Sequence, residues 1–144
     1  MKKIGIVLLV AILSLMAFVV KAQEITGYWF NDVKEAKIEI YKAKNGKYYG
    51  KIVWLKEPNR DGKPKLDIHN VKESLRTRPV MGLLLLSGFD KKESTYENGT
   101  IYDPKNGKTY SCKITPNGND KLNIRGYIGI SLIGRTTVWT RTTH

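Results

Sequence analysis

The stretch Ala36–Leu55, which reads AKIEIYKAKNGKYYGKIVWL, decides the fold of this chain. Apolar and polar residues alternate along residues 36–43, and a period of two is typical of a strand with one buried face. The dipeptide Asn45-Gly46 follows, and both residues tolerate the positive φ angles that a type I′ turn requires. A second alternating run returns over residues 47–55. The stretch therefore predicts an antiparallel β-hairpin, and the residues expected on one face of its second strand are Tyr48, Gly50, Ile52 and Trp54.

Outward from this hairpin, the sequence repeats short apolar runs separated by turn residues. Further strands are expected at residues 25–30, 80–89, 93–96, 100–102, 108–115, 121–127, 128–133 and 135–141. Turn dipeptides such as Asn98-Gly99 and Asn106-Gly107 separate several of them. Successive hairpins without a long crossover favour an up-and-down barrel over a sandwich. We therefore expect an all-β fold, an antiparallel barrel of about eight strands with one short helix before the fourth strand.

The strand pattern breaks between residues 57 and 79. Asn70 and Glu73 have the spacing of a capping box, in which each side chain bonds a free backbone N–H at a helix start. A short helix is therefore expected at about residues 71–77, and Pro79 ends it. The following residues, 80–86, are apolar on both strand faces, so we expect the helix to cover the outer face of that strand.

The first 22 residues have the three parts of a secretory signal peptide. Lys2 and Lys3 begin it, an apolar run follows from Ile4 to Val20, and small or β-branched residues precede a cleavage point before Gln23. An uncleaved membrane anchor is the alternative, because the apolar run approaches the length that spans a bilayer. We expect residues 1–22 to be removed. Residues 23–144 would then be a single β-barrel domain, periplasmic or secreted, with no transmembrane segment.

The chain is strongly basic, with 25 Lys and Arg against 13 Asp and Glu and a net charge of +12. Loss of the three lysines in residues 1–22 leaves +9. Such a charge favours contact with anionic envelope material such as lipopolysaccharide, cell-wall polymer or phospholipid headgroups. Nucleic acid is not expected as a partner, because the chain carries an export signal. The alternative is that the lysines only protect strand edges. Oligomeric state does not follow from the sequence.

No arrangement of residues predicts catalysis, a metal site or a cofactor. His69 and His144 are the only histidines, and neither has Cys, Asp or Glu at the spacing of a metal site. A lone Cys112 cannot form an internal disulfide and is expected to be a small buried residue. The carboxylates that could converge in an active site are Asp67, Glu73 and Asp103. Each also suits a cap or a turn, so the sequence favours a non-enzymatic role.

The last predicted strand carries the pattern that suggests a ligand. Its alternate residues on one face are Arg135, Thr137, Trp139 and Arg141. If that face is the inner one, guanidinium groups lie beside aromatic rings inside the barrel. This arrangement suits an anionic or acyl-tailed ligand. The alternative is structural, with an arginine that stacks on a tryptophan and donates to carbonyls at one end of the barrel.

Short motifs are spread over residues 27–141. They include Gly27-Tyr28-Trp29, Asp67-x-x-Asn70, Leu75-Arg76-x-Arg78-Pro79, Ile101-Tyr102-Asp103-Pro104, Gly107-Lys108-x-Tyr110, Ile124-Arg125-Gly126-Tyr127 and Trp139-x-Arg141. Together they resemble the bacterial family called domain of unknown function 2147, although Val71 stands where that family usually has proline. The resemblance implies an exported envelope protein with a lipocalin-like barrel and no established activity. It also implies that Trp29 closes the barrel base with Arg135 or Arg141 packed across it.

We therefore expect an exported envelope protein that binds a small anionic or amphiphilic ligand in, or at the mouth of, the barrel. The candidate ligand-binding residues are Arg76, Arg78, Arg125, Tyr127, Tyr102, Tyr110, Asp67 and Asn70. The candidate barrel-closing residues are Trp29, Arg135, Trp139 and Arg141. The alternative function is a non-catalytic structural or interaction module of the envelope that acts through its basic surface. An eight-stranded barrel can be filled by side chains or can hold one small ligand, and this choice separates the two functions.

Overall fold

The computed structural model describes residues 24–130 and 132–144. Its strands are β1 (Gly27–Phe30), β2 (Ala36–Lys42), β3 (Tyr48–Leu55), β4 (Asn59–Arg60), β5 (Lys63–Pro64), β6 (Leu84–Lys92), β7 (Thr95–Asp103), β8 (Lys108–Asn117), β9 (Lys121–Tyr127) and β10 (Gly134–Thr142). One 3₁₀ helix, η1 (Glu73–Leu75), lies between β5 and β6. The predicted signal peptide falls outside the described residues. Within the described part of the chain, no helix is long and apolar enough to cross a membrane.

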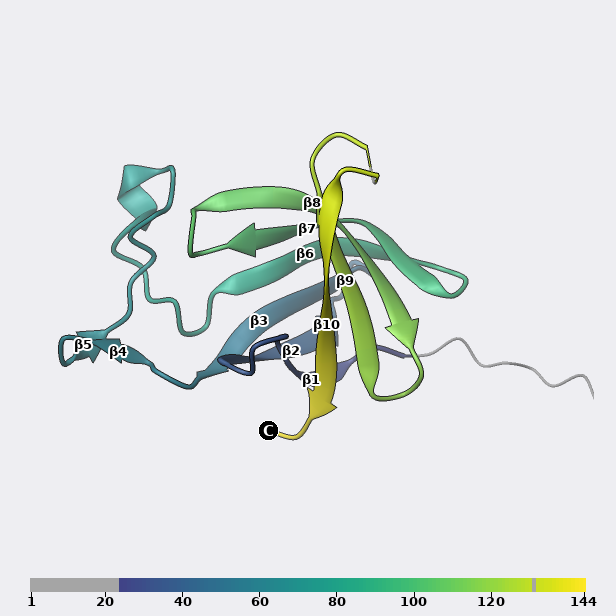
Figure 1. Ribbon diagram of the computed structural model, residues 1–144, viewed down its shortest axis with the longest axis horizontal. Coiled ribbons are helices and arrows are strands. Elements are labelled where there is room, and N and C mark those ends of the chain that lie inside the picture. The colour runs from purple at the N-terminus through teal and green to yellow at the C-terminus, as the bar shows by residue number, and fades with distance from the viewer. Residues whose placement is uncertain (1–23, 131) are drawn as a thin grey trace, which may run out of the picture.

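Eight strands close into an antiparallel barrel, in the order β1-β10-β9-β8-β7-β6-β3-β2 (Figure 1). The first and last of these strands in the chain close the ring, with Trp29 of β1 opposite Arg141 of β10. The two-residue strands β4 and β5 form a small separate hairpin. It projects away from the barrel at the same side as η1 (Figure 1). The expected all-β class and barrel of about eight strands are confirmed.

The hairpin of residues 36–55 forms as expected, except at its last aromatic residue. Ile40 pairs with Gly50, and Tyr48, Gly50 and Ile52 are buried inside the barrel. Trp54 was expected on the same face, which is wrong. The register shifts between Lys37 and Ile38, so that Lys37 pairs with Trp54. Trp54 consequently lies on the surface, with its ring edge-on to Phe30 at 6.0 Å between centroids.

Several strand boundaries differ from the expectation by a few residues, and three differences are larger. The expected strands at residues 93–96 and 100–102 are one strand, β7, and the strand expected from residue 80 begins only at Leu84. No strand forms among the described residues of 128–133. Tyr127 of β9 pairs directly with Gly134 of β10, so the residues between them are the connection of this hairpin. The apolar composition of residues 128–133 resembles that of a strand, but their described residues pair with no neighbouring strand.

The expected helix at residues 71–77 is reduced to the single turn η1. The capping box is also wrong, because Lys72 is the N-cap residue and no side chain caps the turn. Asn70 instead accepts a hydrogen bond from the Lys72 N–H through Oδ1, at 2.8 Å. Asparagine competes well for such local backbone bonds, and they stabilise turns rather than helix interiors.

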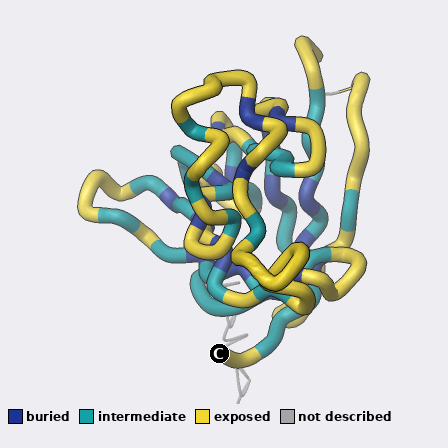
Figure 2. The backbone as a smooth tube through the Cα atoms, turned by 90° about the vertical axis from the view of Figure 1, so that its left-hand side faces the viewer, coloured by how far each residue is buried: buried dark blue, intermediate teal, exposed yellow. Residues whose placement is uncertain are grey.

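The core fills one end of the barrel and thins toward the other. We call the filled end the base; it carries the short connections of residues 43–47, 93–94 and 118–120. The opposite end, which we call the mouth, carries the connections of residues 31–35, 56–83, 104–107 and 128–133. Buried residues follow the strands, whereas exposed residues dominate the connections seen from the left-hand side of Figure 1 (Figure 2).

Candidate functional site

A cavity of about 970 Å³ opens at the mouth of the barrel. Its apolar walls come from inward-facing residues of β2, β3, β7, β9 and β10, because alternate residues of a barrel strand point inside. The main apolar wall residues are Ile38, Ile52, Ile101, Ile124 and Trp139. Four of these are buried and Ile101 is half-buried. The interior is therefore open at the mouth rather than completely filled.

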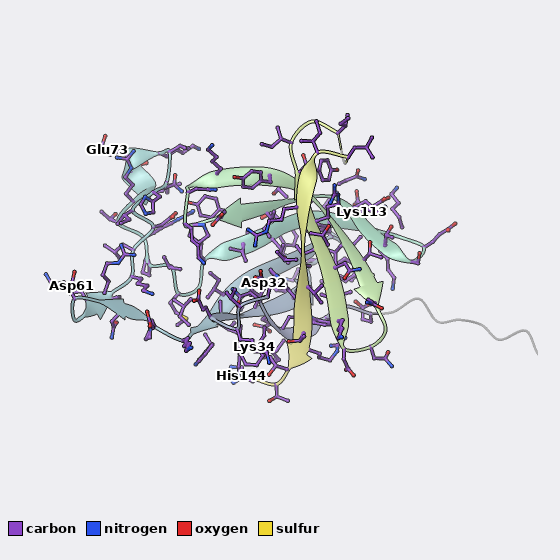
Figure 3. All side chains as sticks on the ribbon, viewed as in Figure 1. Asp32, Lys34, Asp61, Glu73, Lys113 and His144 are labelled. Atoms are coloured by element: carbon purple, nitrogen blue, oxygen red, sulfur yellow. The ribbon has the colours of Figure 1, made fainter. Side chains whose placement is uncertain are left out.

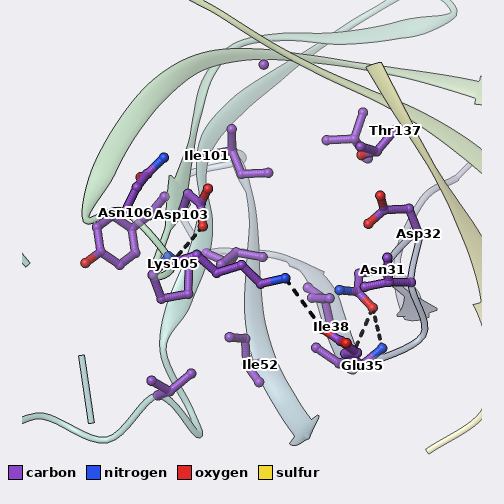
Figure 4. A pocket seen from close by; sticks show the side chains of 18 of the residues that line it. Asn31, Asp32, Glu35, Ile38, Ile52, Ile101, Asp103, Lys105, Asn106 and Thr137 are labelled. Carbon is purple, nitrogen blue, oxygen red and sulfur yellow. Dashed lines mark hydrogen bonds and ion pairs between the residues drawn. The ribbon is translucent and has the colours of Figure 1, made fainter. Parts of the chain in front are cut away.

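Charged side chains from the connections and from the neighbouring strand ends surround this apolar interior. They are Asp32, Glu35, Lys56, Glu57, Arg60, Lys65, Asp103, Lys105 and Arg135. Lys105 reaches across the mouth to Glu35, at 3.5 Å, and thereby joins the β7–β8 and β1–β2 connections (Figure 4). Arg135 lies 3.8 Å from Asp32, while its side chain remains 84% exposed. These long, exposed ion pairs contribute little to stability, so their cations are available to another anion.

The β1–β2 connection is held in shape by an asparagine. Asn31 accepts hydrogen bonds from the backbone N–H groups of Glu35 and Ala36 through Oδ1, at 2.8 and 3.1 Å (Figure 4). Asparagine is suited to this role because its amide oxygen mimics a backbone acceptor in a turn. The two bonds place Asp32 and Glu35 on one side of the mouth, facing Asp103 and Lys105 in the view of Figure 4.

A polar cluster, Asp67, Asn70, Arg78 and Tyr102, anchors the long β3–β6 connection to the barrel. Asp67 is fully buried. It accepts hydrogen bonds from the Tyr102 hydroxyl at 2.5 Å, the Asn70 amide at 2.9 Å and the Arg78 Nε at 2.8 Å. The Arg78 guanidinium also lies 5.5 Å from the centre of the Tyr102 ring. A buried carboxylate needs such partners, because a charge without them is costly to remove from water.

Burial and the nearby carboxylate both act on Tyr102. Its pKa is raised above the ordinary tyrosine value, first by burial and then by its hydrogen bond to Asp67. The hydroxyl therefore stays protonated and donates a hydrogen bond to Asp67. A second close contact fixes the same connection, since a Cβ on Gly107 would lie 1.8 Å from the His69 carbonyl oxygen. Gly107 also has a φ of +74°, so both the close contact and the backbone conformation require glycine there.

The segment around η1 meets the beginning of β6 at the mouth end of the barrel, as a loop rather than as the expected covering helix. Between them is a second hollow of about 320 Å³, whose lining includes Val71, Leu75 and Leu84. Leu84 remains 42% exposed. Arg78 and Tyr102 also border this hollow. The covering of β6 is therefore incomplete.

The structure divides the eight predicted ligand-binding residues into separate groups. Those that line the main cavity are Tyr102, Tyr110 and Tyr127. Asp67 and Asn70 are buried in the polar cluster described above. Arg76 donates to the backbone carbonyl of Asn70 at 2.8 Å, and Arg78 is paired with Asp67. The role of these residues in ligand binding stays a prediction, and neither Arg76 nor Arg78 borders the main cavity.

Arg125 also lies away from the main cavity. It pairs with Lys113 and Thr136, and its neighbours Ile124 and Gly126 face inward, so Arg125 is on the outer face. There it donates to Thr136 Oγ1 at 3.0 Å. Sequence reasoning missed the charged residues of the β1–β2 and β7–β8 connections. Alternate connections of an up-and-down barrel lie at the same end, and this rule could have grouped them.

The residues predicted to close the barrel lie at two levels. The Arg141 guanidinium stacks on the Trp29 ring at 4.2 Å from its centre. It also donates to the carbonyls of Asn119, Thr26 and Glu24, at 2.7, 3.1 and 3.2 Å. Trp29 donates to the Ile25 carbonyl at 2.9 Å and is fully buried. These contacts form the base. Arg135 and Trp139 belong instead to the cavity near the mouth.

The remaining candidates for chemistry lie apart from one another. Cys112 is fully buried, as expected, and burial raises the pKa of its thiol to about 12. In the described residues, no three His, Cys, Asp or Glu side chains are grouped to hold a metal ion. Of the three carboxylates considered for catalysis, Asp103 lines the main cavity, Asp67 is in the polar cluster and Glu73 is on η1. Glu73 is exposed in the surface loop (Figure 3).

Comparison with known proteins agrees with this barrel. A family model described as an uncharacterized protein conserved in bacteria (DUF2147) matches residues 27–141. Protein HP1028 from the human pathogen Helicobacter pylori, whose title assigns it to the lipocalin family, is similar in structure, with a TM-score of 0.72. The two chains share 26% sequence identity, and the match covers 84% of each. No curated protein matches the chain. The predicted family and the lipocalin-like fold are thereby confirmed.

Proposed function

The chain belongs to the DUF2147 family of uncharacterized bacterial proteins, and we propose that it binds a small amphiphile with an anionic head group. The observation that carries the proposal is the cavity of about 970 Å³, apolar inside and charged at its rim. A volume of a few hundred to about 1,000 Å³ is usual for small-molecule sites. A barrel whose side chains filled it completely would leave no such space.

The apolar part of the cavity suits an acyl or alkyl chain. Ile38, Ile52 and Ile124 present only hydrocarbon, and Trp139 adds a broad ring surface at its wall. Burial of an alkyl chain against such a surface contributes about 25 cal/mol for each Å² removed from water. No charged side chain lies among these four residues, so a ligand that was charged along its whole length would lose hydration without compensation.

The rim suits an anionic head group. Among the ion-paired cations of the rim, Arg135 has the most exposed side chain, and its ion pair with Asp32 is long. A guanidinium can hold a carboxylate or a phosphate through two parallel hydrogen bonds. Lys56 and Arg60 enter the same rim from the β3–β6 connection. An anionic head would replace the long Arg135–Asp32 contact with a closer one while the alkyl chain occupies the apolar interior.

The likeness to HP1028 supports small-ligand binding by analogy with the lipocalin family named in its title. Export is part of the proposal as well. Residues 1–22 would direct the barrel to the periplasm or the medium, where envelope lipids and their breakdown products supply amphiphiles. Native mass spectrometry of protein purified from its own envelope would identify a co-purified ligand.

A matched pair of threonines tests whether the cavity is the binding site. Thr137 lines the cavity, whereas its neighbour Thr136 is exposed on the outer face of the same strand. Thr137→Trp should fill the space and weaken dodecanoate binding at least tenfold in isothermal titration calorimetry. Thr136→Trp should change it less than twofold. Failure of the parent protein to bind dodecanoate or any other anionic amphiphile would refute the proposal, as would equal binding by both variants.

A pair of arginines tests the head-group assignment. Arg135→Gln should weaken dodecanoate binding about tenfold, equivalent to about 1.4 kcal/mol, and should leave dodecanol binding nearly unchanged. Arg125→Gln, on the outer face, should affect neither ligand. The opposite result, in which only Arg125→Gln weakens dodecanoate binding, would move the head-group site to the outer face.

A further inference from the structure

Large exposed apolar residues gather at one end of the barrel. Ten of them lie in the mouth connections or at the first residue of β6: Val33, Leu66, Ile68, Val71, Met81, Leu84, Ile128, Ile130, Leu132 and Ile133. The other two are Trp54, near the mouth end of β3, and Val138, in the middle of β10. Within residues 24–130 and 132–144, the base connections contribute none. Scattered exposed apolar residues are ordinary, but such a one-sided distribution marks a contact surface.

The β9–β10 connection is the most exposed part of this surface. Ile128 and Ile133 are each 67% exposed, Ile130 is 59% exposed and Leu132 is 84% exposed. Backbone hydrogen bonds from Ile128 to Ile133 and from Ile133 to Ile130 shape the connection. It rises beyond the ends of β9 and β10 as a projecting loop (Figure 1). Ile128 and Ile133 reach the cavity wall, whereas Ile130 and Leu132 do not line it.

The same end is positively charged. The mouth connections, residues 31–35, 56–83, 104–107 and 128–133, together carry nine Lys and Arg against six Asp and Glu. Arg60 and Lys63 lie in the separate β4–β5 hairpin and are exposed. A surface that combines protruding apolar side chains with an excess of cations is complementary to a bilayer with anionic headgroups.

We propose that the mouth of the barrel docks on an anionic lipid surface, with Ile130 and Leu132 inserted among the acyl chains. The cations of the β3–β6 connection then lie against the headgroups. A second copy of this chain fits less well, because a mouth-to-mouth dimer would bring two positive surfaces together. Docking in this orientation turns the cavity toward the bilayer. The proposal stands on the exposed residues alone and does not require that the cavity bind a ligand.

Vesicle binding tests the apolar part of the surface. Residues 23–144 contain all strands of the closed barrel and lack the apolar run of residues 4–20, which would itself bind lipid. This protein should float with vesicles of phosphatidylglycerol and phosphatidylethanolamine, and should bind phosphatidylcholine vesicles at least tenfold more weakly. The double substitution Ile130→Ser, Leu132→Ser should weaken binding to the anionic vesicles at least tenfold. Val138→Ser, an exposed apolar control on the barrel wall, should not weaken it.

A charge-matched pair tests the orientation. Arg60→Gln with Lys63→Gln, at the mouth, should weaken binding to the anionic vesicles several-fold. Lys44→Gln with Lys121→Gln, which removes equal charge at the base, should have little effect. Equal effects would mean that net charge alone governs binding and would overturn the docking orientation. Failure of the parent protein to bind anionic vesicles, or retained binding by the Ile130/Leu132 variant, would overturn the proposal itself.

Three further measurements separate lipid docking from ligand binding in the cavity and from dimer formation. Dodecanoate titration without vesicles should be unchanged in the Ile130/Leu132 variant, and vesicle binding should be unchanged in Thr137→Trp. Each proposal can therefore fail alone. Analytical ultracentrifugation should find the same mass for the parent and the Ile130/Leu132 variant. A dimer present only in the parent would assign this apolar surface to a second copy and would also overturn lipid docking.

Discussion

The base and the mouth are the two ends of the same barrel, yet residues of the same type have opposite environments at these ends. At the base, Arg141 stacks on Trp29 and donates hydrogen bonds to three backbone carbonyls. At the mouth, Arg135 of the same strand has one long ion pair and an exposed side chain. An arginine in this barrel is therefore structural or available for binding according to the end at which it lies.

The connections explain much of the difference. The base is bridged by short turns, and aromatic rings fill the space between them. Tyr48 and Tyr96 meet edge-on there at 4.8 Å, and Phe89 packs against Gly99, where a Cβ would lie 2.4 Å from the ring. The mouth includes the long connection of residues 56–83, which is anchored at Asp67 but leaves the barrel open. Stability should therefore be concentrated at the base and binding at the mouth.

Trp29→Ala should give the largest difference between the two ends. Loss of this fully buried ring should lower the free energy of unfolding by about 3–5 kcal/mol, because it leaves a cavity at the base. Leu132→Ala, at the exposed mouth, should change it by less than about 0.5 kcal/mol. Urea titration followed by circular dichroism measures both. A Trp29→Ala protein as stable as the Leu132→Ala protein would mean that the base does not hold the barrel closed.

Arg141→Gln should have an intermediate effect. It removes the stacked guanidinium from Trp29 and leaves backbone carbonyls without their donor, so we expect a loss of about 1–2 kcal/mol. Arg135→Gln removes an exposed, long ion pair and should cost less than about 0.5 kcal/mol. Thermal unfolding of both variants alongside the parent tests this order. If Arg135→Gln is the more destabilising, the division of roles along β10 is wrong.

Alkaline pH should lower the stability of the base end of the barrel, and this loss should develop gradually as the pH rises. Burial is the first cause that raises the pKa values of Tyr48 and Tyr96 above the ordinary value, and the nearby Glu24 carboxylate acts in the same direction. In the unfolded chain these phenols lose protons near pH 10. Above that pH the unfolded state binds fewer protons than the folded state, so the free energy of unfolding falls as pH rises.

Urea titrations between pH 8 and pH 11 would measure this fall. Tyr102 of the polar cluster contributes in the same direction, because its pKa is raised as well. Tyr96→Phe should make the pH dependence shallower, since the residue that replaces it does not ionise. An unchanged slope in this variant would show that Tyr96 does not contribute to the alkaline loss of stability.

Much of the fold could be predicted because its cause is local. The alternation in residues 36–55 and the Asn45-Gly46 turn fix which residues pair and which face is buried, and this hairpin forms. The same local rules gave wrong predictions where pairing with a neighbouring strand decided the outcome. The register shift near Ile38 moves Trp54 outside, and direct pairing of Tyr127 with Gly134 leaves residues 128–133 as a connection.

The candidate site was harder to predict, because arginines of similar local sequence have different partners. Arg78 is held by the buried Asp67, eleven residues earlier in the chain, and Arg125 bonds Thr136 on the outer face. Asp67 belongs to the Asp67-x-x-Asn70 motif, but that motif does not identify Arg78 as its partner, and no motif marks Thr136. The charged residues around the mouth, such as Asp32 and Lys105, come from connections that only barrel closure brings together.

By itself, the sequence determined the class of the fold, its hairpins and the excess of positive charge. Strand alternation and turn geometry act over a few residues, so a single sequence contains them completely. Only the tertiary structure decided that Arg141, rather than Arg135, seals the base with Trp29 and that the mouth stays open. These outcomes depend on the pairing of β1 with β10 and on the long connection of residues 56–83, which borders the mouth. Such contacts join residues far apart in the chain, and their geometry exists only once the barrel has closed.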